Sequence, residues 1–221
     1  MKPRHEYKYP VNNADIISLK SRLGALMQRD THAGPNGQYT VRSLYFDNYT
    51  DKALREKIDG INQREKFRIR YYNDDTSFIN LEKKSKKNGM CYKEKAAITA
   101  DQCRRIFKGD LSFLIESDIP LFKELYVKMR FGLLRPRCIV SYTRECFVYP
   151  AGNVRITIDT DICRSLNVRD FLNPDTLCIK PKSTKLLEIK YDEFLPEAVR
   201  NLVSLKCRRA SAFSKYGAMR F

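Results

Sequence analysis

An alternation of charged and apolar side chains runs through the stretch KFRIRYY, residues 66–72. Successive side chains of a β-strand point to opposite faces, so Lys66, Arg68 and Arg70 share one face while the other is aromatic or aliphatic. The stretch therefore predicts a β-strand with one basic and one apolar face. The turn signal Asn73-Asp74 that follows indicates a hairpin leading into a second strand.

Similar alternations recur along the rest of the chain. They predict eight strands, at about residues 4–9, 38–46, 65–72, 77–84, 91–98, 137–149, 154–162 and 185–191. Two further turn signals, Asn88-Gly89 and Ala151-Gly152-Asn153, also stand between alternating stretches. Such short connections favour antiparallel pairing, because parallel neighbours need long crossovers.

Helical periodicity is present between the predicted strands. Helices are expected at about residues 13–29, 99–107, 120–131 and 196–206, with a shorter one at 51–58. Asn13 is the expected N-cap of the first helix, Thr99 and Gln102 form a capping-box pattern, and Pro196 fits the first position of the last helix. The predicted fold class is α+β, a single domain over residues 1–221 in which eight antiparallel strands form a barrel and amphipathic helices pack outside.

The charge of the chain indicates a polyanionic partner. Its 221 residues include 42 lysines and arginines against 26 acids, a formal net charge of +16, and 43% are hydrophobic, enough for a packed core. Nucleic acid, a membrane surface and a phosphorylated ligand are all compatible with this excess. Because no run of 18 apolar residues and no signal-peptide core is present, we expect no membrane segment and a cytoplasmic location.

The cysteines and histidines argue against two other classes of site. Seven cysteines occur without a C-x-x-C pair, and His5 and His32 are the two histidines, which disfavours a zinc finger or a disulfide scaffold. The cysteines are expected to act as small apolar core residues. The glycine-rich phosphate motifs GxxxxGK[ST] and GxGxxG are also absent.

The charged strand faces raise two alternatives. In an ordinary half-buried sheet they would face water. In a closed barrel covered by helices they would line a tunnel with nine bases and four acids: Lys8, Arg68, Arg70, Lys84, Lys93, Arg144, Arg155, Lys190, Lys215, Glu6, Glu82, Asp159 and Glu188. Uncompensated buried ions cost several kcal/mol each, so this tunnel would have to contain water or an anion such as triphosphate.

Eight short segments follow one another in a fixed order between residues 6 and 216. They are EYKY (6–9), VRSLYFDN (41–48), KFRIRYY (66–72), LEKK (81–84), YTR (142–144), RITID (155–159), LEIKY (187–191) and SAFSKY (211–216). In these segments the chain resembles the VTC domain, the polyphosphate polymerase module of the vacuolar transporter chaperone complex, which is similar to the triphosphate tunnel metalloenzymes. Without an inositol-phosphate-sensing domain or a transmembrane segment, it resembles the stand-alone prokaryotic form.

The resemblance implies an enzyme that transfers the ATP γ-phosphoryl group to inorganic polyphosphate. ATP and polyphosphate are then the partners, and a divalent metal, Mn²⁺ or Mg²⁺, is the cofactor, held by Glu188. The implied phosphate-binding residues are Lys8, Arg68, Arg70, Lys84, Lys93, Arg144, Arg155, Lys190, Ser214 and Lys215. Of these, Arg68, Arg70, Arg144, Lys190 and Lys215 are the implied catalytic set. Lys95 competes with Lys93 for its position, because the preceding loop can shift the register.

Two other functions stay open. The same scaffold can hydrolyse tripolyphosphate or a nucleoside triphosphate, and a non-enzymatic module can simply bind a polyanion. Nucleic acid is not expected as the partner, because stacking would need aromatic side chains beside the bases, whereas strand parity places the two on opposite faces.

Overall fold

The computed structural model describes residues 4–88, 90–181, 184–205 and 208–220. One antiparallel sheet dominates it, with the order β1-β9-β8-β7-β3-β4-β5-β6, while the two-residue β2 pairs separately with β7. All eight predicted strands are confirmed. The strands are β1 His5–Val11, β2 Gln28–Arg29, β3 Gln38–Asp47, β4 Arg64–Tyr72, β5 Asp75–Lys87, β6 Met90–Ile98, β7 Arg135–Tyr149, β8 Val154–Ser165 and β9 Lys185–Tyr191.

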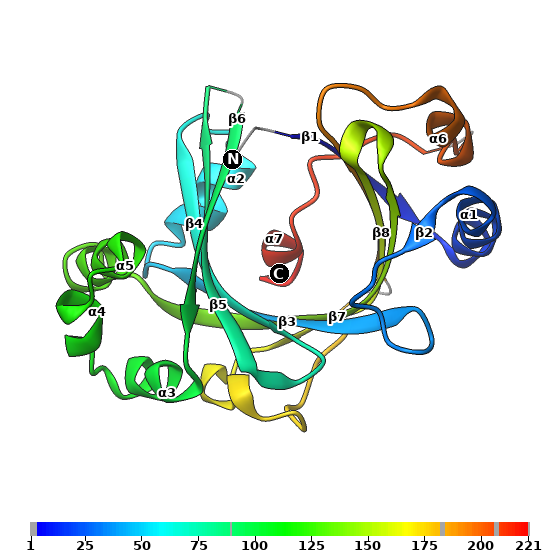
Figure 1. The fold of residues 1–221 in the computed structure, drawn as a ribbon. Helices are drawn as coiled ribbons and strands as arrows, with labels where there is room; N and C mark the ends of the chain where they lie inside the picture. Colours follow the sequence, from blue (N-terminus) through cyan, green and yellow to red (C-terminus); the bar gives the residue numbers. More distant parts are fainter. Residues whose placement is uncertain (1–3, 89, 182–183, 206–207, 221) are drawn as a thin grey trace.

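The sheet curls around a central axis, and Figure 1 looks into its interior. Its two edge strands, β1 and β6, flank an opening and share no ladder in the described ranges. The sheet is therefore a curled half-barrel rather than a barrel closed by backbone hydrogen bonds. Charged side chains approach each other across the opening, since Lys190 on β9 and Glu6 on β1 both affect the pKa of Lys84 on β5.

The connections between strands have the predicted turn chemistry. Asn73 and Asp74 take positive φ angles of 52° and 55° between β4 and β5, as a tight hairpin turn requires. Gly152, between β7 and β8, has a φ of 71°, and a Cβ there would lie 2.3 Å from the Phe194 carbonyl oxygen. A side chain is therefore excluded at Gly152. Of the predicted Asn88-Gly89 turn, Gly89 lies outside the described residues.

The helices lie on both flanks of the curled sheet and inside it. Figure 1 shows α3, α4 and α5 outside one flank, α1 and α6 outside the other, and α7 within the curl. Their bounds are α1 Asn13–Leu26, α2 Lys52–Ile58, α3 Ala100–Lys108, α4 Ser112–Glu116, α5 Pro120–Arg130, α6 Glu197–Leu202 and α7 Lys215–Ala218, with 3-10 turns η1 Ala151–Asn153 and η2 Val168–Leu172.

Several helix ends differ from the prediction. The first helix ends at Leu26 rather than residue 29, because the next residues form β2 and pair with β7. Its N-cap is Asn12 rather than Asn13, in a capping box with Asp15. The capping box of Thr99 is confirmed. The last predicted helix, 196–206, is shorter, since α6 ends at Leu202 and Pro196 precedes it as the N-cap; residue 206 lies outside the described ranges.

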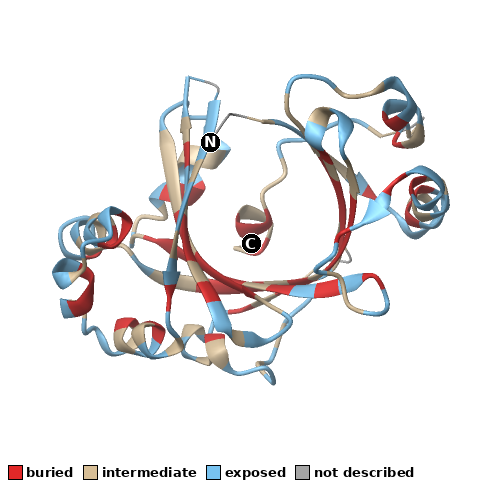
Figure 2. Cartoon of the chain, in the orientation of Figure 1, coloured by how far each residue is buried: buried red, intermediate tan, exposed pale blue. Residues whose placement is uncertain are grey.

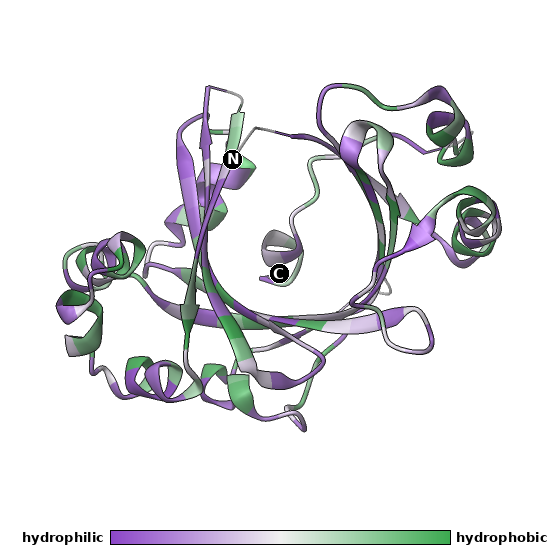
Figure 3. Ribbon diagram, in the orientation of Figure 1, coloured by the Kyte–Doolittle hydropathy of each residue, from purple (hydrophilic) through white to green (hydrophobic). Residues whose placement is uncertain are grey.

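Two apolar clusters hold the outer helices to the sheet. Leu44, Ile69 and Leu81 pack with residues of α3, α4 and α5, and α1 and α6 cover a second cluster that includes Ile156 and Ile189. Figure 2 shows buried residues along the curved sheet and on the covering helices. In Figure 3 these helices carry both hydrophobic and hydrophilic residues, as amphipathic helices on a sheet should.

A third apolar cluster lies inside the curl, and the sequence did not predict it. Tyr216 and Met219 at the α7 end pack with Tyr45, Val140 and Tyr142 of β3 and β7, among other residues. Tyr216 stacks on Tyr45 at 5.2 Å between ring centroids. Part of the concave face is therefore filled by apolar side chains, and the charged face occupies the remainder.

The cysteines follow the prediction only in part. Cys103, Cys138 and Cys146 are free and buried, as expected of core residues. Cys91 is exposed, and Cys163 forms a disulfide with Cys178, so the prediction is wrong for these. The pairing follows from a two-residue bridge between Arg164 and Ile179, which brings distant segments together. Cys207 lies outside the described residues.

Within the described ranges, no helix combines the length and the apolarity that crossing a bilayer would require.

Asp47 links β3, α2 and α7, and its removal should destabilise the fold. The buried carboxylate accepts hydrogen bonds from the Ala53 and Leu54 amides and from the Tyr216 hydroxyl, at 2.8, 3.1 and 2.7 Å. We expect Asp47→Ala to lower the free energy of unfolding by roughly 3 kcal/mol, measured by urea denaturation. Tyr216→Phe, which removes one of these bonds, should cost about 1 kcal/mol. Equal losses would show that Asp47 does not anchor α2.

Candidate functional site

The strand register places the predicted basic residues on the concave face. Residues directly opposite one another in neighbouring strands share a face of the sheet. The opposed pairs are Ser43 with Arg70, Arg68 with Glu82, Lys84 with Lys93, Arg144 with Asp159, Arg155 with Lys190, Glu6 with Lys190 and Lys8 with Glu188. Ser214 and Lys215 belong to the α7 segment inside the curl (Figure 1).

Two buried carboxylates hold the most enclosed cations. The Arg144 guanidinium group donates two hydrogen bonds to Asp159, at 2.6 and 2.8 Å. The Lys215 ammonium nitrogen lies 2.5 Å from Asp159 Oδ2 and 2.9 Å from Glu188 Oε1. Burial would raise the pKa of both carboxyl groups, but Arg144 and Lys215 lower the pKa of Asp159, and Lys215 and Lys190 lower that of Glu188 well below its usual value.

A second group of charges lies along β1 and β9. Lys190 Nζ lies 3.2 Å from Glu6 and 3.3 Å from Glu188, and Lys8 Nζ lies 3.5 Å from Glu6 and 3.8 Å from Glu188. Burial would raise the pKa of Glu6, but Lys190 and Lys8 lower it to about 2. Glu6 is therefore ionised at neutral pH.

On the opposite side, Glu82 joins β4 to β6. It accepts from Arg68 Nε at 2.7 Å and pairs with Lys93 Nζ at 2.6 Å. Burial works against ionisation, yet Arg68 and Arg70 lower the pKa of Glu82. Lys93 and Lys95 both lie on this face, opposite Lys84 and Glu82, and Lys93 makes the ion pair with Glu82.

Arg70 is a buried cation that makes no ion pair among the described residues. The residue is 6% exposed to solvent. Nε donates to the Ser43 hydroxyl at 2.9 Å and Nη2 to the Tyr142 hydroxyl at 3.1 Å. Both acceptors are neutral, and none of the ion pairs in the described part of the chain includes Arg70. A guanidinium group stays protonated, and the carboxylate of Glu82, whose charge acts on Arg70, is already paired with Arg68 and Lys93. An anion in the tunnel would therefore add to the compensation of Arg70.

Lys84 and Lys66 are also cations surrounded by cations. Lys190, followed by burial and Arg68, lowers the pKa of Lys84 well below its usual value. The Lys84 side chain is nevertheless accessible to water, so the lumen around it is wet. Burial, then Lys57 and Arg64, lowers the pKa of Lys66 to about 8. An anion among these side chains would relieve their repulsion.

Two predicted residues are engaged elsewhere. Arg155 Nη2 lies 2.5 Å from Asp30 and 3.1 Å from the Tyr39 hydroxyl, so its charge is already compensated. Ser214 caps α7, where its hydroxyl oxygen accepts from the Gly217 amide at 3.2 Å. Its hydroxyl proton remains available for a ligand.

The sequence prediction omitted residues that shape the site. Lys66 could have been included, because it shares strand parity with Arg68 and Arg70. Tyr142 lies within the YTR segment, but its bond to Arg70 depends on how β7 and β4 face each other. Asp30 compensates Arg155 from 125 residues away, and no local signal marks it.

The donor set of Glu188 is compatible with a divalent cation that phosphates also bind. Among the described residues, no three His, Cys, Asp or Glu side chains gather as a protein-only metal site. Mg²⁺ is commonly held by one or two carboxylates together with substrate phosphates. Glu188, which shares Lys215 with Asp159, fits that mode, in which the phosphates complete the ligand set.

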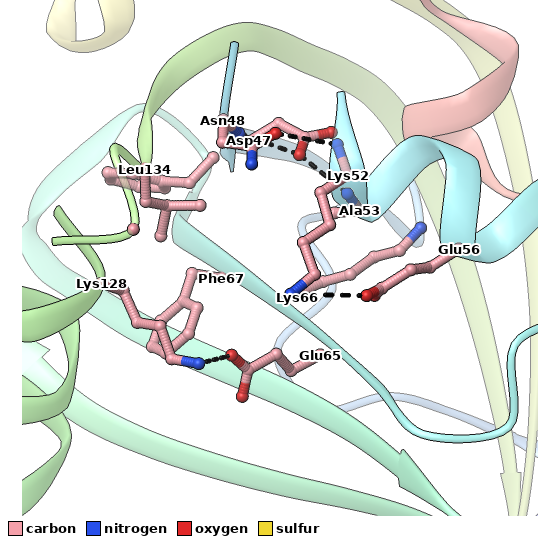
Figure 4. Close-up of a pocket in the computed structure, with 12 residues that line it drawn as sticks. Asp47, Asn48, Lys52, Ala53, Glu56, Glu65, Lys66, Phe67, Lys128 and Leu134 are labelled. Atoms are coloured by element: carbon pink, nitrogen blue, oxygen red, sulfur yellow. Dashed lines mark hydrogen bonds and ion pairs between the residues drawn. The ribbon is translucent and has the colours of Figure 1, made fainter. Parts of the chain in front are cut away.

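A small cavity beside the tunnel does not suit a polyanion. It has a volume of about 150 Å³ and lies between α2, β4 and the end of α5 (Figure 4). Its three lysines face three carboxylates: Lys52, Lys66, Lys128, Asp47, Glu56 and Glu65. Lys52 pairs with Glu56, and Lys128 with Glu65. Two of its three lysines are therefore already paired, and the third, Lys66, is shared with the tunnel face.

Comparisons with known proteins identify the fold and the family. An adenylate cyclase candidate from Bacillus halodurans is 14% identical, with a TM-score of 0.52 over 91% of this chain and 84% of that one, which shows a shared fold. One from Vibrio parahaemolyticus is 10% identical, with a TM-score of 0.45 over 91% of this chain and 84% of that one. The curated proteins give no match. The family model of the VTC domain matches residues 3–220, and the chain therefore belongs to the VTC domain family.

Proposed function

We propose that this chain is an ATP-dependent polyphosphate polymerase, which transfers the ATP γ-phosphoryl group to the end of an inorganic polyphosphate chain and releases ADP. The observation that carries the proposal is Arg70, a buried guanidinium group that is held by Ser43 and Tyr142 and makes no ion pair among the described residues. Lys84 and Lys66, which make no ion pair among the described residues, add further basic groups on the same face. Membership of a family related to triphosphate tunnel enzymes agrees with a triphosphate substrate.

The basic residues have distinct roles in this proposal. Arg68 and Arg70 present guanidinium groups to successive phosphate oxygens, while Lys190 and Lys215 act as point charges. Arg144 is held beside these two lysines by the carboxylates that it shares with them. A terminal oxygen of the polymer attacks the γ-phosphorus. The bond from that phosphorus to the β,γ-bridging oxygen breaks, and this oxygen leaves with the electron pair as part of ADP. Positioning and charge neutralisation carry most of the catalysis in such transfers.

The acids of the tunnel favour a phosphate acceptor over water or a hydroxyl group. The pKa values of Glu6, Glu82, Asp159 and Glu188 are all lowered, because each carboxylate lies against cations. Carboxylates of low pKa are weak general bases. Hydrolysis, or the cyclase reaction suggested for the structural neighbour, would require a base for water or the ribose hydroxyl. A phosphate terminus is already an anion and requires none.

Glu188 is the residue proposed to hold a divalent metal, Mn²⁺ or Mg²⁺. Such an ion neutralises phosphate charge and stabilises the group being transferred. Asp159 lies beyond Lys215 and remains paired with Arg144, so it holds the cations in place.

Polymer synthesis can be tested directly. The purified chain is incubated with ATP and Mn²⁺, and the products are separated on a gel stained for polyphosphate. We expect a ladder of long chains with an equivalent amount of ADP, and no product after the metal is removed with EDTA. Free phosphate without polymer would contradict the proposal and favour the hydrolase.

Substitutions in the tunnel should separate chemistry from folding. We expect Arg70→Ala to lower kcat/KM for ATP by about 100-fold or more, because a buried charge that stabilises the transition state is removed. Glu188→Gln should abolish the dependence of the rate on metal concentration. Arg104→Ala, which removes an exposed arginine from α3, is the matched control and should leave the rate unchanged. Full activity of Arg70→Ala in a folded protein would remove Arg70 from the site.

Binding of phosphate should take up protons near pH 8. The pKa of Lys66 is lowered to about 8 in the free protein by burial and by Lys57 and Arg64. A bound phosphate chain favours the charged ammonium form and raises this pKa. Tripolyphosphate affinity should therefore fall as the pH rises through 8. Calorimetry in buffers of different ionisation enthalpy measures the proton uptake, which should decrease in Lys66→Gln. Unchanged uptake in that variant would assign the protons to another group.

A further inference from the structure

One end of the tunnel carries a row of cations that extends beyond the proposed triphosphate site. They lie on α2 and at the adjoining ends of β4 and β5, and are called the mouth cluster below: Lys57, Arg64, Lys66, Lys84 and Lys86. Lys57 lies close enough to Arg64, Lys8 and Lys86 for their charges, after burial, to lower its pKa. Within the described ranges, no carboxylate makes an ion pair with any member of the mouth cluster.

The strand register brings these like charges face to face. Arg64 lies directly opposite Lys86, Lys66 opposite Lys84, and Lys84 opposite Lys93 on β6. Like charges in directly opposed positions destabilise a sheet. Several cations elsewhere on the concave face have carboxylate partners, as Arg155 has Asp30 and Arg144 has Asp159. The repulsion is therefore concentrated at the end of the tunnel that α2 flanks.

The basic row on β4 is longer than a triphosphate requires. Arg64, Lys66, Arg68 and Arg70 alternate along the strand and share its concave face. At about 3.3 Å per residue, the row extends over roughly 20 Å. A triphosphate has three phosphorus atoms in line and cannot contact both ends of that row at once. A longer chain of phosphates can.

We propose that the mouth cluster is a subsite for the extended part of an inorganic polyphosphate chain, which leaves the tunnel between α2 and the β4–β5 end. The inference rests on the proposed function and adds a direction to it: the triphosphate lies near Arg70, and the polymer continues past Lys66 and Lys84 toward Arg64, Lys57 and Lys86. The members of the mouth cluster contact successive phosphate groups of one chain, so the binding affinity is higher for a long chain than for a short one. The ring of Tyr216 lies 5.5 Å from Lys66 Nζ, but Tyr216 is buried and so is not available for stacking on a base, and Phe67 is on the other side of the strand and also buried.

The test compares ligands of different length. Dissociation constants of tripolyphosphate, long-chain polyphosphate and a single-stranded DNA oligonucleotide are measured at several KCl concentrations for the wild type and for Arg64→Gln/Lys86→Gln. The double variant removes one opposed pair and leaves the residues around Arg70 intact. Lys108→Gln/Lys123→Gln is the control, because it removes the same charge from exposed positions on α3 and α5.

We expect the mouth variant to bind long-chain polyphosphate about tenfold more weakly, with tripolyphosphate affinity nearly unchanged. The slope of log affinity against log salt should fall by about 0.7 for each phosphate group that the variant no longer neutralises. The control variant should behave as the wild type. Equal weakening for both phosphate ligands, no weakening, or equally weakened binding of DNA would each overturn the subsite.

Failure of the subsite can be told apart from failure of the proposed function. A wild-type protein that binds neither tripolyphosphate nor ATP would contradict the polymerase itself. A wild-type protein that binds both, with a mouth variant insensitive to chain length, would contradict the subsite alone. Tripolyphosphate binding by the mouth variant also reports that its tunnel is folded, and its melting temperature should equal or exceed that of the wild type, because a repulsive pair is removed.

Discussion

A surplus of positive charge inside a curled sheet governs how the rest of this structure is arranged. The predicted tunnel residues, nine bases and four acids, lie on the concave face or on α7, and every one of the four acids lies against a cation. Packing alone cannot stabilise Arg70, because a buried charge without a directly paired counter-ion is costly. The stabilising apolar contacts are therefore concentrated in the outer clusters and around α7, while the lumen remains wet and ready for an anion.

The short helix α7 positions Lys215 between two acids of the tunnel. Tyr216 anchors it to Asp47 and stacks on Tyr45, and this placement carries Lys215 to a position between Asp159 and Glu188. Because Lys215 bridges the two carboxylates, they can lie close together while both are ionised. Arg144 bridges the same two carboxylates, with Nε 2.6 Å from Asp159 and Nη2 3.7 Å from Glu188. A segment near the end of the chain thus completes a site whose other members come from strands.

Much of this arrangement could be predicted from local pattern. The period of two in KFRIRYY, repeated in the other segments, was sufficient to assign the strands and to place Arg68, Arg70 and Glu188 on one face. The capping box of Thr99 marked a helix start for the same local reason. Elements that depend on a distant partner were missed or misplaced. β2 forms because Gln28 meets Val148, and Cys163 pairs with Cys178 because a bridge at Arg164 brings the segments together.

Residue order alone therefore specified the family, the strand set and which side chains share a face, since each of these follows from local motifs and side-chain alternation. Which charges are compensated became visible only in the folded chain. Arg155 donates to the carboxylate of Asp30, whereas Arg70 donates to the hydroxyl groups of Ser43 and Tyr142, although both are arginines on strands with the same pattern. This difference arises because electrostatic compensation depends on distance through space, and the curl of the sheet sets those distances.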